Sequence, residues 1–214
     1  MLLNSSKRDL VMLLNSSKRD LVMLLNSSKR DKMIIMKRKI YNEMLQWKQN
    51  SQGKTDLMID GARRIGKSYI VEEFSKKEYK SYILVDFNNA DSDLMEIFDK
   101  YLKNLDLFFS YLALYFNVTL YPRDTAIIFD EVQLYPKARA AIKYLVKDGR
   151  YDYIETGSLV SINRNVKDIV IPSEEYRMNM YPMDFEEFLW AMGDEQMMPF
   201  IRNCYEKKQA LGPL

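Results

Sequence analysis

The sequence contains no histidine and only one cysteine, and these two absences exclude several kinds of chemistry. Without histidine, no serine, cysteine or threonine nucleophile can be activated by an imidazole base, and no zinc site can use imidazole ligands. Cys204 alone cannot form an internal disulfide or a thiolate metal site. We interpret Cys204 as an apolar filler and expect a reducing, cytoplasmic compartment.

Long apolar runs and a strong excess of one charge are also missing. The longest uncharged stretch, 107–122, has sixteen residues and includes polar side chains. A membrane-spanning helix needs ~20 apolar residues, so we expect no membrane association and interpret this stretch as a buried helix leading into the next strand. The net charge is +2, but seven basic and three acidic residues lie in 1–32, so residues 33–214 carry −2. Bulk charge therefore does not support nucleic-acid binding, although a local basic patch stays open.

The N-terminus is a tandem repeat with a period of eleven residues. The sequence MLLNSSKRDLV fills residues 1–11, recurs at 12–22 and begins again at Met23. Each junction places five apolar residues in a row, which surround a helix instead of forming one stripe. We therefore expect residues 1–33 to be a poorly ordered tail.

The rest of the chain alternates between helical and strand patterns. Strands separated by helices predict an α/β fold with a parallel sheet covered on both faces. Asp184 and Glu187 form a capping box that begins a further helix. We expect a core domain over 34–183 and, over 184–214, the helical start of a truncated C-terminal region. The patterns predict helices over about 37–50, 67–77, 92–103, 106–116 and 138–149, and strands over about 55–60, 82–87, 125–130, 151–156 and 176–181.

The loop after the first predicted strand matches G-x-x-x-x-G-K-[ST] at every fixed position. Backbone amides of such a P-loop surround phosphates, and the following helix directs its N-terminus at them. Lys67 would reach the β- and γ-phosphates of ATP, and the Ser68 hydroxyl is a hard ligand for Mg²⁺. Arg63 and Arg64 are either phosphate contacts or solvated loop residues. The predicted nucleotide-binding segment is Gly61, Ala62, Arg63, Arg64, Ile65, Gly66, Lys67 and Ser68.

An apolar strand that ends in Asp130 and Glu131 is the second chemical element. The carboxyl ends of parallel strands meet at one edge of the sheet, where the P-loop also lies. We predict that Asp130 holds Mg²⁺, directly or through water, and that Glu131 polarises the attacking water. Two acids can also simply end a strand, but the complete P-loop upstream favours the catalytic interpretation.

The fourth predicted strand ends in hydroxyl side chains, Thr156 and Ser158. This edge of the sheet faces the γ-phosphate in P-loop proteins, so either hydroxyl could sense it. A plain turn after the strand is nearly as good an interpretation. Candidates for an arginine that acts on the phosphates are Arg139, Arg164 and Arg177, although an arginine on a helix or strand face is usually solvated.

Four segments together resemble a bacterial and archaeal family of predicted AAA+ ATPases. They are GARRIGKS, IIFDEVQ, KARAAIKYLVKDGRYDYIETGS and PSEEYRMNMYPMDFEEFLWA, and the resemblance extends from about Met36 to Leu214. It implies a five-stranded parallel sheet in the order 5-1-4-3-2, with Asp130 as the magnesium ligand and Glu131 as the catalytic glutamate. Gln133 matches the Gln of the family's D-E-x-Q. Family members continue into a C-terminal domain of unknown function, which is nearly absent here, and the repeat is not a family feature.

These observations lead to two hypotheses from different classes. The first is a Mg²⁺-dependent ATPase of the AAA+ type, catalysed by Lys67 and Glu131. The second is a nucleotide-binding interaction module with little or no hydrolysis, because the C-terminal domain is missing. A small-molecule kinase is less well supported, since no acceptor pocket or basic lid can be recognised. A homo-oligomer or a protein partner stays open.

Overall fold

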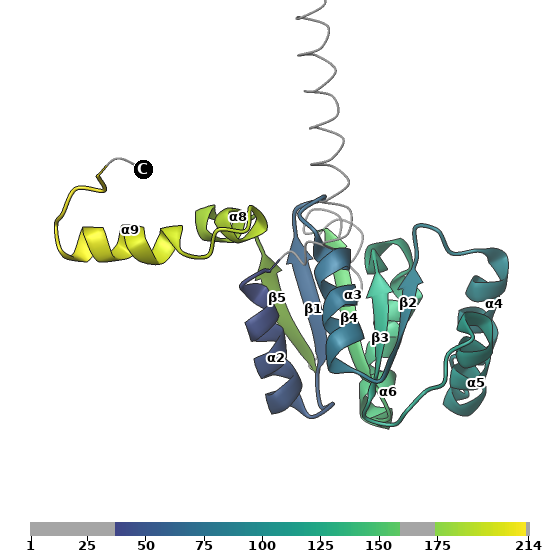
Figure 1. The fold of residues 1–214 in the computed structure, drawn as a ribbon. Helices are drawn as coiled ribbons and strands as arrows, with labels where there is room; N and C mark the ends of the chain where they lie inside the picture. The colour runs from purple at the N-terminus through teal and green to yellow at the C-terminus, as the bar shows by residue number, and fades with distance from the viewer. Residues whose placement is uncertain (1–36, 159–173, 213–214) are drawn as a thin grey trace, which may run out of the picture. The chain divides into compact units, whose positions relative to one another are not determined.

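The computed structural model describes residues 37–158 and 174–212, which contain one sheet of five strands. The strand order is β2-β3-β4-β1-β5, and every neighbouring pair is parallel (Figure 1). From the opposite edge this is 5-1-4-3-2, so the predicted fold is confirmed. The tail predicted for 1–33 lies outside the described residues. The strands are β1 (Asp56–Gly61), β2 (Ser81–Asp86), β3 (Thr125–Asp130), β4 (Asp152–Ser158) and β5 (Glu175–Met180).

Helices fill the described connections between consecutive strands, as the crossovers of a parallel sheet require. The helical region predicted from 184 onward is divided in two, because α8 ends at Ala191 and Gly193 adopts a left-handed φ of 86°. The helices are α2 (Ile40–Ser51), α3 (Lys67–Glu78), α4 (Ser92–Tyr101), α5 (Leu105–Phe116), the 3₁₀ turn η1 (Val132–Leu134), α6 (Pro136–Asp148), α8 (Phe185–Ala191) and α9 (Met197–Glu206).

The three inner strands β3, β4 and β1 are buried at every position, because helices cover both faces of the sheet. Side chains of β1 alternate between the faces. Leu57 and Ile59 pack in one apolar cluster with residues of α2 and α3, whereas Met58 belongs to a second cluster with residues of α4, α5 and α6. This double cover explains the continuous apolar runs in the sequence, and it leaves the strand ends as the place for polar chemistry.

Residues 107–116 of the longest uncharged stretch form most of α5, and 117–122 follow as a loop before β3. Of the twelve residues of α5 only Phe108, Phe109 and Leu112 are buried, so the expectation of a buried helix is wrong. Asn104 caps this helix by accepting a hydrogen bond from the Leu107 amide, and Asn117 ends it in a left-handed conformation. Within the described ranges, no helix has the length and apolar character to cross a membrane.

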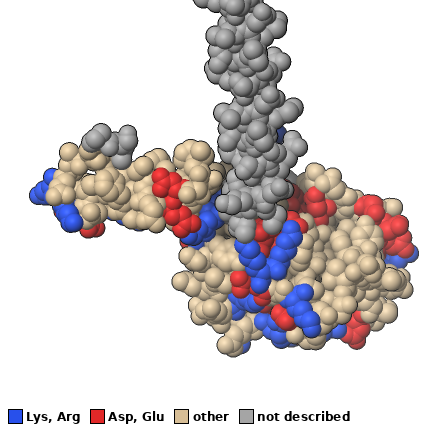
Figure 2. Space-filling model, viewed as in Figure 1, with Lys and Arg blue, Asp and Glu red and all other residues tan. Residues whose placement is uncertain are grey.

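Charged side chains of both signs lie close together on the face of the molecule that Figure 2 shows. On α3, the ammonium of Lys76 lies 2.9 Å from Glu72, and that of Lys77 lies 3.9 Å from Glu73. Pairing at helical spacing of this kind neutralises a basic stretch locally. It agrees with the small net charge of the sequence.

Candidate nucleotide site

The P-loop connects the carboxyl end of β1 to the first turn of α3, as predicted. Gly61 is the last residue of β1, and a Cβ atom there would collide with the backbone carbonyl of Met180 at the end of β5. Gly66 has a φ of 93°, a left-handed conformation that glycine adopts without steric cost, and it immediately precedes α3. The two fixed glycines of the motif are therefore required by close packing and by backbone conformation, respectively.

Lys67 is the first residue of α3, and its side chain is folded back into the loop. Its ammonium donates hydrogen bonds to the carbonyl oxygens of Gly61 at 3.0 Å and of Ala62 at 2.8 Å. Burial lowers the pKa of Lys67, and the carboxylates of Glu131 and Asp130 oppose this shift. The loop thus holds a cationic side chain close to Asp130, the last residue of β3, and to Glu131, which follows it.

Three polar side chains from three elements meet at one carboxylate oxygen. The Ser68 hydroxyl of α3 donates to Oδ1 of Asp130 at 2.9 Å, and the Thr156 hydroxyl of β4 donates to the same atom. Asp130 itself is almost completely buried at the end of β3. Hydroxyl and carboxylate oxygens are hard ligands of the kind that Mg²⁺ prefers, so this donor set fits a magnesium ion.

Glu131 follows β3 in a left-handed conformation, with a φ of 54°. Its backbone amide donates to the Thr156 hydroxyl at 3.4 Å, and its carboxylate accepts a hydrogen bond from the side-chain amide of Gln133. Gln133 is nearly completely buried in η1. A non-glycine residue in this backbone region is strained, and such strain persists only where neighbouring contacts hold it. Here the contacts of Thr156 and Gln133 fix the position of the Glu131 carboxylate next to the P-loop.

Comparison with known proteins agrees with this arrangement. A family model described as an AAA domain matches residues 54–189, which begin just before β1 and end within α8. The chain belongs to this AAA domain family. Membership implies nucleotide binding at the P-loop, and the family's members are typically ATPases.

Other comparisons add little to the family match. No curated protein matches the chain. Among solved structures, that of C. elegans PCH-2 is similar over 78% of this chain and 44% of its own, with 10% sequence identity and a TM-score of 0.36. The AAA domain described here therefore spans less than half the length of that protein.

The remaining predicted site residues are four residues of the P-loop, which are exposed or half-buried, and Ser158 of β4, which is buried. Ala62, Arg63 and Arg64 are exposed, and Arg64 has a left-handed φ of 64°. Ile65 is half-buried. Ser158 is a buried residue at the end of β4 and pairs in register with Gly61, which places it beside the start of the loop.

The suggestion that Arg139 acts on the phosphates is wrong, as is the expectation of a solvated side chain there. Arg139 lies on the packed face of α6 and is fully buried, and its guanidinium forms ion pairs with Glu155 at 2.6 Å and with Glu175. Arg139 precedes Ile142 by three residues and Val146 by seven, so the helical period placed it on the buried face.

The other two arginine candidates gain no support. Arg164 lies outside the described residues. Arg177 is on β5, and its guanidinium pairs with Asp60 at 3.3 Å and with Glu175 at 2.8 Å. Both of these ion-pair partners are residues of the sheet, Asp60 in β1 and Glu175 in β5.

Two buried residues that contact the candidate site have no predicted role. Gln133 matches a position of the D-E-x-Q motif, and Arg38 belongs to no motif of the sequence. The Arg38 guanidinium donates to the Ile65 carbonyl at 2.9 Å. No local pattern marks this contact, because its partner is 27 positions away in the sequence.

Proposed function

We propose that this chain binds Mg-ATP at the P-loop and hydrolyses it. One observation supports this proposal most strongly. Ser68, the last residue of a complete P-loop, and Thr156 both donate hydrogen bonds to Oδ1 of Asp130. This contact joins the strand-end aspartate to the P-loop serine that is the predicted Mg²⁺ ligand, which supports a shared role of the two residues in nucleotide chemistry. Ser68 and Asp130 would hold Mg²⁺, and the ion would supply positive charge that neutralises the phosphates.

Each side chain has a defined part in this proposal. Lys67 exchanges the carbonyl oxygens of Gly61 and Ala62 for the β- and γ-phosphates, which are stronger acceptors because they are charged. Ser68 and Asp130 hold the metal. The amides of the loop and of the first turn of α3 bind the phosphates.

Glu131 orients the attacking water and accepts its proton as the water oxygen bonds to the γ-phosphorus. The bond between the γ-phosphorus and the β,γ-bridging oxygen breaks, and ADP leaves with that oxygen. The Thr156 hydroxyl accepts a hydrogen bond from the backbone amide of Glu131, which supports a role for Thr156 in sensing the γ-phosphate. Ser158 is a second candidate for this sensing role at the same edge of the sheet.

The contact between Gln133 and Glu131 favours a second function, a nucleotide-binding interaction module. The side-chain amide of Gln133 donates to one carboxylate oxygen of Glu131, and this bond occupies an acceptor that could otherwise bind the attacking water. In this case nucleotide exchange, rather than hydrolysis, would control a partner or a second copy of the chain. An arginine supplied in trans would then be required for rapid turnover, a contribution of ~10³–10⁵-fold in P-loop enzymes.

Single-turnover hydrolysis with enzyme in excess separates the two functions. Glu131→Gln keeps the shape of the side chain but removes the base, so we expect retained Mg-ATP affinity and hydrolysis slowed by at least ~100-fold. Asp130→Ala is the matched comparison and should weaken magnesium-dependent binding itself. Equal, measurable rates in wild type and Glu131→Gln would remove the catalytic role from Glu131. Binding without hydrolysis in the wild type would support the interaction module.

A further inference from the structure

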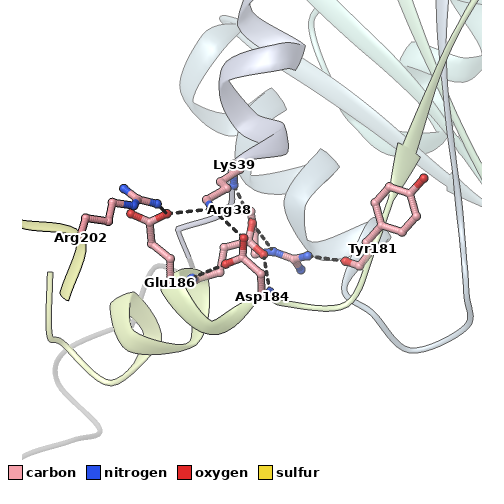
Figure 3. Close-up of polar contacts among 7 residues, drawn as sticks. Arg38, Lys39, Tyr181, Asp184, Glu186 and Arg202 are labelled. Carbon is pink, nitrogen blue, oxygen red and sulfur yellow. Dashed lines mark hydrogen bonds and ion pairs between the residues drawn. The ribbon is translucent and has the colours of Figure 1, made fainter. Parts of the chain in front are cut away.

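One buried guanidinium connects the P-loop to the helices that follow the sheet. Arg38 lies two residues before the start of α2 and is only 6% exposed. Its two terminal nitrogens donate to backbone carbonyls. One donates to Tyr181 at 2.6 Å (Figure 3), and the other donates to Ile65 at 2.9 Å. Its Nε atom forms an ion pair with Glu187 of α8 at 3.2 Å. Three segments that are far apart in the sequence therefore meet at one side chain.

The contact with Ile65 orients a peptide group of the P-loop. The peptide between Ile65 and Gly66 is planar and trans, so the Gly66 N–H points away from the Ile65 carbonyl. Because Arg38 holds the carbonyl, it also fixes the direction of that N–H. This amide is among the free donors at the N-terminus of α3, the groups that bind phosphate in such loops. A charge-assisted bond to the carbonyl also polarises the peptide, which makes its N–H a better donor.

The contact with Glu187 ties the same guanidinium to the start of α8. Glu187 is nearly buried and closes the capping box of this helix by accepting from the Asp184 amide at 3.2 Å. Its other oxygen accepts from the Lys39 amide at 2.7 Å. Glu187 thus fixes both the first turn of α8 and the direction of the Arg38 side chain.

We propose that Arg38 is a positioning residue for nucleotide binding, and that through Glu187 it couples the occupancy of the P-loop to the stability of α8. The proposal rests on nucleotide binding at the P-loop. Phosphate that binds the Gly66 amide strengthens the peptide arrangement that Arg38 holds, and this in turn favours the ion pair with Glu187. By reciprocity, loss of that ion pair weakens nucleotide binding.

Lys39 provides a matched control, because it also binds α8 but has no contact with the P-loop among the described residues. Its ammonium lies 2.6 Å from Asp184 and 2.8 Å from Glu186, and it is partly exposed. If Arg38 only attached α8 to the domain, Lys39→Gln and Arg38→Gln would affect nucleotide affinity alike. If Arg38 positions the loop, only the Arg38 variants weaken binding.

The test combines Mg-ATP titration with hydrogen exchange of α8 amides, with and without nucleotide. We expect Mg-ATP to protect α8 in the wild type, and Arg38→Gln to bind at least tenfold more weakly and to lose this protection. Arg38→Lys keeps the charge but not the forked geometry, so its affinity should lie between the two. Lys39→Gln should behave as the wild type. If Arg38→Gln is unfolded by circular dichroism, Arg38→Lys and Glu187→Gln decide, and both should bind more weakly than the wild type.

Two results overturn the inference alone. They are wild-type affinity in the folded Arg38 variants, and exchange of α8 that is unchanged by nucleotide while the wild type binds it. Absence of Mg-ATP binding in the wild type would instead contradict the proposed function and the inference together.

Discussion

Asp56 begins β1 with both carboxylate oxygens buried and without a hydrogen-bond partner in the described part of the chain. Burial raises the pKa of Asp56 to about 8, the carboxylate of Glu175 adds to the shift, and Arg139 opposes it. In the unfolded chain this carboxyl titrates near 3.8. The folded state therefore binds more protons than the unfolded state between about pH 4 and pH 8, and Asp56 makes stability fall as the pH rises through this window.

Asp56→Asn should remove this pH dependence, because the amide carries no charge to bury. We expect the variant to be more stable than the wild type at pH 8 and to differ less at pH 5, in urea unfolding at several pH values. Glu43→Gln, at an exposed carboxyl in the first turn of α2, is the control and should keep the wild-type profile. The interpretation would be contradicted if the difference in stability between Asp56→Asn and the wild type were the same at pH 5 and at pH 8.

Single residues also mark the limit of sequence reasoning. The P-loop positions were predicted from the fixed spacing of a motif, and Asp130 was predicted because it ends an apolar strand. The network of Arg139, Glu155 and Glu175 was not, because its members lie on three elements and their burial depends on how α6 packs against the sheet. The role of Arg38 was invisible for the same reason, since its contacts are long-range.

At the scale of elements, the end of β1 is held in place by β5. Gly61 pairs in parallel register with Met180, and the Met180 carbonyl occupies the space that a side chain at 61 would need. The P-loop therefore starts from a point fixed by two strands. This close approach explains why the first position of the motif must be glycine in this sheet, in addition to any demand of the phosphate.

Gly61→Ala should cost about 1–3 kcal/mol of unfolding free energy through overpacking, and should also weaken ATP binding because the loop must shift. Gly149→Ala is the matched control. Gly149 ends α6 with a φ of 75°, so alanine there costs roughly 1–2 kcal/mol of backbone strain, far from the P-loop in sequence. Urea unfolding and ATP titration of both variants should show two destabilised proteins, of which only Gly61→Ala has lost affinity. Equal affinities in the two would contradict the steric account.

Element boundaries were predicted well where apolar runs are long, as for β3, and less well where the chain ends a helix early. The pattern after 184 suggested one helical region, but Gly193 separates α8 from α9. The capping box of α8 was predicted correctly from Asp184 and Glu187, because both of its hydrogen bonds are local. Local signals were thus readable, whereas packing between elements was not.

For the whole molecule, the alternation of helices and strands predicted a parallel α/β sheet, but not its strand order. Five strands can be arranged in many ways, and the order 5-1-4-3-2 came from the family resemblance. The sheet and the AAA domain match over 54–189 now agree with it. Family membership implies nucleotide binding at the P-loop.

The central claim is that the P-loop of this AAA domain binds Mg-ATP through Lys67, and equilibrium titration of Mg-ATP tests it most directly. Lys67→Ala removes charge-assisted contacts to phosphate, so affinity should fall by at least ~10-fold while far-UV circular dichroism is unchanged. Lys76→Ala removes an exposed lysine from the same helix and should bind as the wild type does. Wild-type affinity in a folded Lys67→Ala variant would contradict the account.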